Sequence, residues 1–450
     1  MTLTTAMAVA LFLGQAPADT TPPAGQPAQP AQPTLPADAT GPVITLDQTL
    51  QLAAERNLDL KALSAQLDEA QEITWKALSL YLPQVALSAS TQRQKKIVEP
   101  IFGAGAPPAL VQGASATFFQ AEADQVLFSP RLFFAIDNAR QSQKAAVLNL
   151  DNGRRQVFFG VARAYYATAS LKEALGVAQR LLEVAQRQEH DAQVRYTAGA
   201  TAKVALIRAQ IDRARAEEDV KRARASYLSA KVALAALLAR DTAFEVTAPP
   251  EASLPAGDLD ALVTQALEAR PDVAAFRVLL RAEDANRKSV LSRYLPDVGG
   301  FARWQWEDAP GLTGGKGNNW VIGLQGRWTI LDGFRRESDL REANARIREA
   351  NARADGAVVR TRQEVTQALL DLESARANAQ KSKEQRDLAA ENQRLVDVSY
   401  RAGTATAVEQ ADATAQLRNA EIGVLTDTLS AQLAALNVLN SIGSFNPRKH

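Results

Sequence analysis

The chain of 450 residues contains no cysteine, only two histidines, and few aromatic residues (6%). The lack of cysteine excludes disulfides, thiolate catalysis and cysteine-ligated metals. The net charge is only +1, from 51 basic and 50 acidic residues, whereas a nucleic-acid partner would require a basic excess. His190 and His450 have no partner at metal-site or triad spacing, and the Gly-rich stretch at residues 311–317 fails as a P-loop. We therefore expect no enzyme, no cofactor and no bound metal.

The N-terminus resembles an export signal. An apolar run at residues 6–13 is followed by small residues at Ala16 and Ala18, which predicts a signal peptide over residues 1–18. No Lys or Arg precedes this run, so a frayed apolar terminus is the alternative. Residues 19–42, rich in Pro, Ala and Gln, are predicted to be a disordered linker. No later apolar run approaches the roughly 20 residues of a membrane-spanning helix, so the exported chain is expected to be periplasmic, secreted or an outer-membrane β-barrel.

The rest of the chain contains a duplication. Residues 55–85 align without a gap onto residues 268–298, which lie 213 positions later, and both stretches end on Tyr-Leu-Pro-x-Val. A second repeated motif, Tyr-x-Ala-Gly, begins at Tyr196 and again at Tyr400, 204 positions later. Each copy is far longer than one unit of a solenoid, so the sequence indicates duplication of a half-molecule.

Each copy reads as a helix, two strands, a very long helix, a tight turn and a returning helix. The first long helix contains no proline over 131–196 and would be about 100 Å long at about 1.5 Å per residue. The shorter helices are expected at 47–80, 201–240, 272–293 and 406–442. The predicted organisation is repeat 1 at 43–242 (strands about 84–97 and 115–128, long helix about 131–196), a connector at 243–257, repeat 2 at 258–445 (strands about 297–307 and 319–330, long helix about 335–400), and a tail at 446–450.

Between the helices, the apolar pattern changes to period two. Trp320, Ile322, Leu324 and Trp328 share one face, the other face is largely polar, and in repeat 1 only Gln125 interrupts the apolar face. Such segments match tilted transmembrane strands with a lipid face and a wet lumen, and we expect the four named apolar residues to face lipid. An amphipathic sheet on a soluble core is the alternative. Four strands alone would leave edge amides unpaired in lipid, so several chains must contribute to a barrel.

Three features together resemble the TolC-type outer-membrane efflux protein family. They are the two Tyr-Leu-Pro-x-Val motifs, the two Tyr-x-Ala-Gly turns, and Leu331-Asp332-Gly333 between a strand and a long helix. The resemblance covers about residues 43–445. It implies a mainly α-helical chain with a transmembrane β part, located in the outer membrane and extending into the periplasm. Three chains would form an α-helical barrel and a 12-stranded β-barrel with four strands per chain.

The implied function is a passive exit duct that opens at its periplasmic tip, in a tripartite efflux pump or a type I secretion system. Its partners would be two further copies of itself, a periplasmic adaptor (membrane fusion) protein, an inner-membrane pump or ABC exporter, and outer-membrane lipid. A soluble periplasmic coiled-coil scaffold or adaptor is the alternative. The duplication of the whole chain favours the duct, because an adaptor needs one helical hairpin rather than two.

The resemblance also implies which residues form the tip. Acidic residues at the positions of Glu409 and Asp412 line the narrow periplasmic entrance in the family, and their i, i+3 spacing puts both on one helix face. A solvated charge pair on an ordinary helix is the alternative. Six such carboxylates in a trimer would repel one another, which predicts raised pKa values. The tip turns that meet the adaptor are expected at Tyr196, Gly199, Tyr400 and Gly403.

This sequence departs from the family pattern at the latch of the closed tip. Ala405 stands where the best-known members have an Arg, and Ala205 stands where they have an Asp. We therefore expect the closed state to be held by Arg208 or Lys203 beside the acidic residues, or to be held less tightly.

Overall fold

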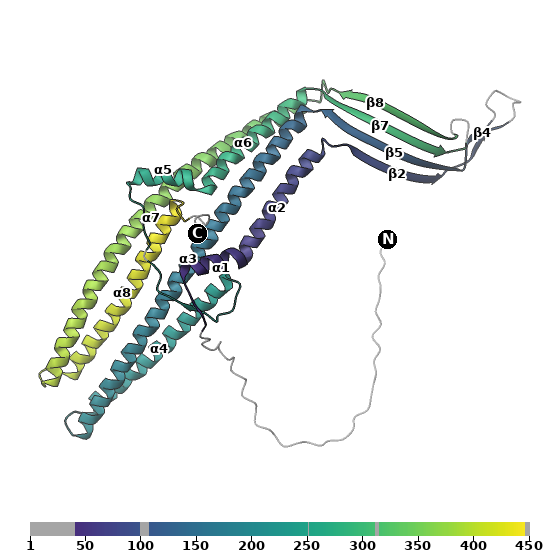
Figure 1. The fold of residues 1–450 in the computed structure, drawn as a ribbon. Coiled ribbons are helices and arrows are strands. Elements are labelled where there is room, and N and C mark those ends of the chain that lie inside the picture. The colour runs from purple at the N-terminus through teal and green to yellow at the C-terminus, as the bar shows by residue number, and fades with distance from the viewer. Residues whose placement is uncertain (1–40, 100–107, 251, 311–314, 446–450) are drawn as a thin grey trace, which may run out of the picture. The chain divides into compact units, whose positions relative to one another are not determined.

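The computed structural model describes residues 41–99, 108–250, 252–310 and 315–445 (Figure 1). The predicted signal peptide, the linker as far as residue 40, and the tail with His450 lie outside the described residues. The helices are α1 (Leu46–Arg56), α2 (Leu58–Ser79), α3 (Pro130–Thr197), α4 (Lys203–Leu237), α5 (Leu259–Ala269), α6 (Pro271–Leu291), the 3-10 turn η1 (Ser292–Tyr294), α7 (Arg335–Arg401) and α8 (Ala407–Ser441). The strands are β1 (Val43–Ile44), β2 (Gln84–Arg93), β3 (Ile97–Glu99), β4 (Ala109–Gln112), β5 (Ser115–Phe128), β6 (Glu245–Val246), β7 (Asp297–Asp308) and β8 (Lys316–Arg327). The predicted fold class, mainly α with an antiparallel β part, is confirmed for the single chain.

The helices reproduce the duplication seen in the sequence. Helices α1 and α5 each have 11 residues and begin 213 positions apart, and α4 and α8 each have 35 residues and begin 204 positions apart. The long helices α3 and α7 have 68 and 67 residues. In each repeat, two shorter helices pack along the long one: α2 and α4 along α3, and α6 and α8 along α7 (Figure 1). The distance in sequence between equivalent residues of the two repeats falls from 213 to 204 positions, because the connection from β2 to β5 in repeat 1 is longer than the connection from β7 to β8 in repeat 2.

The prediction of one continuous helix over 47–80 is wrong, because the chain breaks at Asn57. The Asn57 backbone has ψ 129, and its side-chain oxygen accepts a hydrogen bond from the Leu60 amide at 3.1 Å, which caps α2. Its side-chain amide also donates to the Leu237 carbonyl at the end of α4, at 2.9 Å. The same break recurs 213 positions later, where Arg270 precedes Pro271 at the start of α6.

Four strands form one antiparallel sheet in the order β2-β5-β7-β8. The central β5–β7 pair joins the two repeats, and β2 and β8 are the edges of the sheet. Strand β8 ends at Arg327, so the prediction that it runs to residue 330 and includes Trp328 is wrong. The Trp328 ring lies just beyond the strand, where its Nε1 donates to the Tyr294 carbonyl of η1 at 3.1 Å.

Two further pairs of short strands were not predicted. Strands β3 and β4 form an antiparallel pair within the connection between β2 and β5, and the strand expected over 84–97 stops at Arg93. Strands β1 and β6 pair in parallel, Val43 with Glu245 and Ile44 with Val246. This second pair ties the start of repeat 1 to the connector that follows it.

The buried core lies beside the middle of the long helices and is itself duplicated. In repeat 1, Ala53, Val161 and Leu238 are fully buried in one apolar cluster. Their counterparts in repeat 2, Ala266, Val365 and Ile442, are fully buried in a second cluster. Repeat 1 adds Tyr165, which donates to the Ile44 carbonyl at 3.0 Å. The helices are therefore fixed near their centres and extend from there in both directions.

Among the described helices, α8 alone is long and apolar enough to cross a membrane by length and composition. The sequence reading identified no such segment, because the apolar residues of α8 do not form an uninterrupted run. The helix carries five charged residues and packs along α7, and the Ser382 hydroxyl of α7 donates to its Asp427 carboxylate. These contacts make α8 part of the helical assembly.

Candidate functional site

The two hairpin tips are built by the same backbone motif. Gly199 and Gly403 adopt φ values of +72 and +79, in the left-handed region that favours glycine. In the first tip, the Gly199 amide donates to the Tyr196 carbonyl at 3.0 Å and the Ala200 amide donates to the Arg195 carbonyl at 2.8 Å. In the second tip, the Gly403 amide donates to the Tyr400 carbonyl at 3.1 Å, and the Thr404 amide donates to the Ser399 carbonyl at 2.9 Å. This pair of bonds is a Schellman motif, which satisfies the last carbonyls of a long helix.

The side chains of the two tip tyrosines differ in their surroundings. Tyr400 is half-buried and lines a cavity of about 380 Å³ between the two hairpins, whereas Tyr196 is exposed and does not line it. The Arg195 guanidinium carbon lies 4.9 Å from the centroid of the Tyr400 ring, within the range of a cation–π interaction. Charged side chains of both signs line the rest of the cavity: Arg187, Asp191, Arg208, Asp212, Asp397 and Arg401.

Glu409 and Asp412 are both exposed on the same side of α8. Glu409 has a local structural role, because it completes a capping box with Thr406. The Thr406 amide donates to Glu409 Oε2 at 2.7 Å, and the Glu409 amide donates to Thr406 Oγ1 at 3.2 Å. Hydrogen bonds from the Thr406 backbone and side chain lower the pKa of the Glu409 carboxyl. Within one chain this is the reverse of the predicted rise, and the effect of neighbouring chains stays a prediction.

A single chain does not bring the predicted latch residues to the acidic pair. Arg208 lines the tip cavity together with Gln410 and Ala411, which lie on the side of α8 opposite to Glu409 and Asp412. Lys203 begins α4 and is not among the described residues that line the cavity. The sequence did not predict the contact between Arg195 and Tyr400. The only sign of it in the sequence is that Arg195 directly precedes the first Tyr-x-Ala-Gly motif.

The sheet has one apolar and one polar face, as the alternation predicted. The strand register aligns Leu87, Ala121, Trp304 and Trp320 across the apolar face. Along β8, Trp320, Ile322 and Leu324 are 70%, 72% and 75% exposed, although they are large and apolar. Water is a poor surrounding for such a face, so an apolar medium or another protein must cover it.

Gln125 is the exception on this apolar face, and its side-chain N–H groups are bonded to the backbone. Its Nε2 donates to the carbonyl oxygens of Tyr81 and Val126, so these N–H groups do not depend on water. It lies next to a bulge in the β5–β7 pairing, close to the helical end of the sheet. Gln125 therefore bonds the backbone at the junction between strand and helix, and its position on this face does not conflict with an apolar environment.

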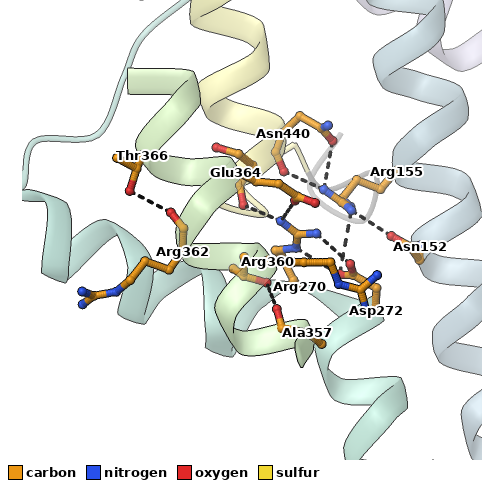
Figure 2. A network of polar contacts seen from close by, with 12 residues as sticks. Asn152, Arg155, Arg270, Asp272, Ala357, Arg360, Arg362, Glu364, Thr366 and Asn440 are labelled. Carbon is orange, nitrogen blue, oxygen red and sulfur yellow. Dashed lines mark hydrogen bonds and ion pairs between the residues drawn. The ribbon is translucent and has the colours of Figure 1, made fainter. Parts of the chain in front are cut away.

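A network of charged groups built on two buried arginines, Arg155 and Arg270, lies near the middle of the long helices (Figure 2). Arg270 precedes α6 and donates to both oxygens of Asp272, at 3.1 and 2.7 Å, to Glu364 of α7 at 2.5 Å, and to the Ser441 carbonyl at 3.3 Å. Arg155 of α3 donates to the Asn440 carbonyl at 2.6 Å, and lies 3.9 Å from Asp272. The network thus joins α3 of repeat 1 to three helices of repeat 2.

Electrostatics explains how these charges tolerate burial. Burial lowers the pKa of Arg155, and the neighbouring Arg270 lowers it further. Burial alone would lower the pKa of Arg270, but hydrogen bonds with Asp272 and Glu364 raise it overall. Burial is the largest single influence on Asp272 and opposes its ionisation. The hydrogen bond from Arg270, the positive charges of Arg270 and Arg155, and the Val273 amide together outweigh burial and lower the pKa of that carboxyl. The shifts of Arg270 and Asp272 both favour their charged forms, so this ion pair contributes to structure and not to proton transfer.

A family model described as outer membrane efflux protein matches residues 49–240 and 262–444, one segment in each repeat. The pyoverdine export outer membrane protein OpmQ of Pseudomonas putida is 26% identical over 262 residues, which cover 56% of this chain and 54% of OpmQ. The cobalt-zinc-cadmium resistance protein CzcC of Cupriavidus metallidurans is 26% identical over 271 residues, which cover 58% of each chain. The matched segment thus spans little more than half the length of either relative.

A solved structure extends the likeness to nearly the whole chain. The outer membrane protein VceC of Vibrio cholerae has a TM-score of 0.73 to this chain, at 20% sequence identity. The likeness covers 88% of this chain and 96% of VceC. At this identity the comparison establishes the fold alone.

Proposed function

This chain belongs to the outer membrane efflux protein family, and we propose that three copies of it form a passive channel-tunnel, the exit duct of a tripartite efflux pump or a type I secretion system. Members of this family are transport channels of the outer membrane and not enzymes, and the chain resides in the outer membrane and extends into the periplasm. The threefold assembly, the opening of the tip and the partner proteins are parts of the proposal.

The observation that carries the proposal is the four-stranded sheet with an exposed apolar face. Its edge strands β2 and β8 have no strand partner within the described residues. Unpaired backbone amides are not tolerated in lipid, so the sheet requires strands from other chains on both sides. Since β2 and β8 are different edges, contact between them is head-to-tail, and such contacts form a closed ring when the rotation between neighbouring chains closes. Three chains would provide twelve strands.

The long helical hairpins support the tunnel part of the proposal. Helix α3 has 68 residues, which at about 1.5 Å per residue corresponds to about 100 Å. The turns at Gly199 and Gly403 lie at the ends of the hairpins, where an adaptor protein would bind and open the tip. An inner-membrane pump or ABC exporter would supply the energy, and the duct itself would remain passive.

The absence of cysteine from the chain allows a clean test of the assembly. We would place one cysteine in the middle of each edge strand, as Ser88→Cys and Val321→Cys, with neighbouring positions scanned because the register between chains is unknown. Oxidation should convert the double variant into covalent trimers and no larger species. Each single variant should remain uncrosslinked, because a head-to-tail contact does not pair a residue with itself. Covalent dimers from the single variants would contradict the proposal.

The cargo of the duct does not follow from similarity. The two curated relatives are equally similar to this chain at 26% identity, yet one is named for pyoverdine export and the other for cobalt-zinc-cadmium resistance. We expect the cargo to be selected by the inner-membrane partner. Deletion of the gene, followed by measurement of which compounds accumulate in the cell, would identify it.

A further inference from the structure

The polar face of the sheet has a specific composition. If the apolar face contacts lipid, as the proposed function requires, the opposite face lines the lumen of the barrel. Most of the polar residues on this face in the described strands are uncharged amides and serines: Gln84, Ser88, Ser90, Gln92, Gln120, Gln305, Asn319 and Gln325. The few charged residues on it therefore determine the electrostatic potential along the lumen.

One ion pair lies on this face, near the middle of the central strands. Glu122 of β5 and Arg303 of β7 are directly opposite in the strand register. Arg303 Nε and Nη2 each lie 2.8 Å from Glu122 Oε1. The Arg303 guanidinium also lies over the ring of Phe301, 5.1 Å from its centroid. Two contacts of different kinds thus hold the Arg303 side chain in a defined position.

The other charges on the polar face are Asp124, Asp297, Glu307 and Arg327, so acidic residues outnumber basic ones apart from the pair. Asp124 lies two residues from Glu122 on β5, whereas the other three lie at or next to the ends of β7 and β8. Arg303 is the only basic residue in the central part of the face within the described strands. The loss of either member of the pair would leave one uncompensated charge per chain, and three per trimer.

We propose that the Glu122–Arg303 pair sets the charge selectivity of the barrel lumen, by cancelling charge at its middle so that solutes of either sign can pass. This proposal rests on the proposed function. The pair is 34% and 45% exposed and contributes little to stability. Its effect on permeating ions is larger than on folding, because rings of charged side chains control which ions enter a pore. The effect is limited by salt, since the screening length is about 30 Å at 0.01 M and about 3 Å at 1 M.

The test uses the purified full-length protein in planar bilayers under a potassium chloride gradient. Arg303→Gln should shift the reversal potential towards cation selectivity, and Glu122→Gln should shift it towards anions. The double variant Glu122→Gln with Arg303→Gln, and the exchanged pair Glu122→Arg with Arg303→Glu, should both return it close to the wild-type value. The shifts should be larger at 0.01 M than at 1 M salt.

The controls separate this inference from the function on which it rests. Charges at the tip are common to all variants, so differences between the variants report on the barrel. Single variants that behave like wild type, or that both shift in the same direction, would overturn the role of the pair. A wild-type protein that forms neither trimers nor channels would instead overturn the proposed function. The neutral double variant shows whether loss of the side chains alone disturbs the channel.

Discussion

The guanidinium of Arg195 lies over the ring of Tyr400, 4.9 Å from the ring centroid, and joins the far end of α3 to the far end of α7. The two residues come from different repeats, so this contact holds the two hairpin tips of one chain together. Further along the hairpins, Arg418 of α8 and Asp219 of α4 form an ion pair at 3.4 Å. The tip therefore has contacts between hairpins that do not depend on the family's missing Arg and Asp.

Arg195→Gln is expected to loosen the tip. A partly exposed cation–π contact contributes about 0.5–1 kcal/mol, and the trimer would lose three of them. We expect more frequent openings in single-channel recordings. Tyr400→Phe is the matched control, because it keeps the ring and should resemble wild type. If the Arg195→Gln channel opens as often as the wild-type channel, the contact does not restrain the tip.

The acidic pair at the tip is best tested without disturbing the helix cap. Glu409→Gln with Asp412→Asn removes both charges, while glutamine still serves as the third residue of a capping box. We expect lower cation selectivity and weaker block by multivalent cations from the periplasmic side. Glu349→Gln, at an exposed pair with Arg353, is the control and should change selectivity much less. Unchanged ion selectivity in the double variant would contradict the prediction that Glu409 and Asp412 line the periplasmic entrance.

Gly403→Val is expected to impair coupling to the adaptor while leaving the barrel intact. At φ +79 a β-branched residue is strained, by about 1–2 kcal/mol or more. Open space surrounds the position, so the strain comes from the backbone and not from crowding. Gly403→Asn, which tolerates this conformation, should retain more activity. Efflux assays and trimer formation on gels would be measured together, and loss of the trimer would contradict the placement of this turn.

The lipid face is tested by two neighbouring residues on opposite sides of β8. Leu324→Arg should reduce stable insertion, because an arginine on the lipid face costs up to about 2–4 kcal/mol per chain at the bilayer midplane and less towards the interface. Leu324 lies towards the helical end of β8, so we expect a cost below that maximum. Gln325→Arg introduces the same side chain on the polar face and should be tolerated. The amount of each variant in the outer-membrane fraction gives the answer. Equal amounts of the two would mean that the faces have been assigned incorrectly.

The central charge network predicts a dependence of stability on pH. The lowered pKa of Asp272 means that its carboxylate stabilises the fold fully above its unfolded pKa of about 4, and that this contribution is lost as pH falls through the lower folded value. Asp272→Asn should therefore destabilise the protein by about 1–2 kcal/mol at pH 7, because a charged hydrogen bond to Arg270 is lost. Thermal unfolding in detergent should show the two proteins converging as pH falls below about 4. A difference independent of pH would exclude the ion pair as the cause.

The sequence predicted the helices and their turns well because local signals mark them. Gly199 and Gly403 end the long helices, and the repeated motifs align the two halves of the chain. The break at Asn57 was missed, although its counterpart is visible in repeat 2 as Arg270 before Pro271. Asparagine is a weaker signal than proline, since it breaks a helix only when its side chain finds partners such as the Leu237 carbonyl.

Contacts between distant parts of the chain could not be predicted. Arg155 and Asn440 lie 285 positions apart, and nothing in either local sequence indicates the other. Trp328 continues the apolar alternation of β8, yet the strand ends one residue earlier, and the Trp328 ring donates a hydrogen bond to the Tyr294 carbonyl. Glu409 was identified from the resemblance as a channel residue, and its bond to Thr406 adds a role in helix capping.

The unpaired edges of the sheet have a consequence for biogenesis. The single chain has its apolar clusters and helical hairpins, but β2 and β8 find no strand partner within its described residues. Such edges also invite pairing with unrelated strands, which makes the single chain vulnerable to aggregation. If the proposed trimer forms, we therefore expect insertion and association to be coupled, and the yield of channel to depend steeply on how many chains arrive at the membrane together.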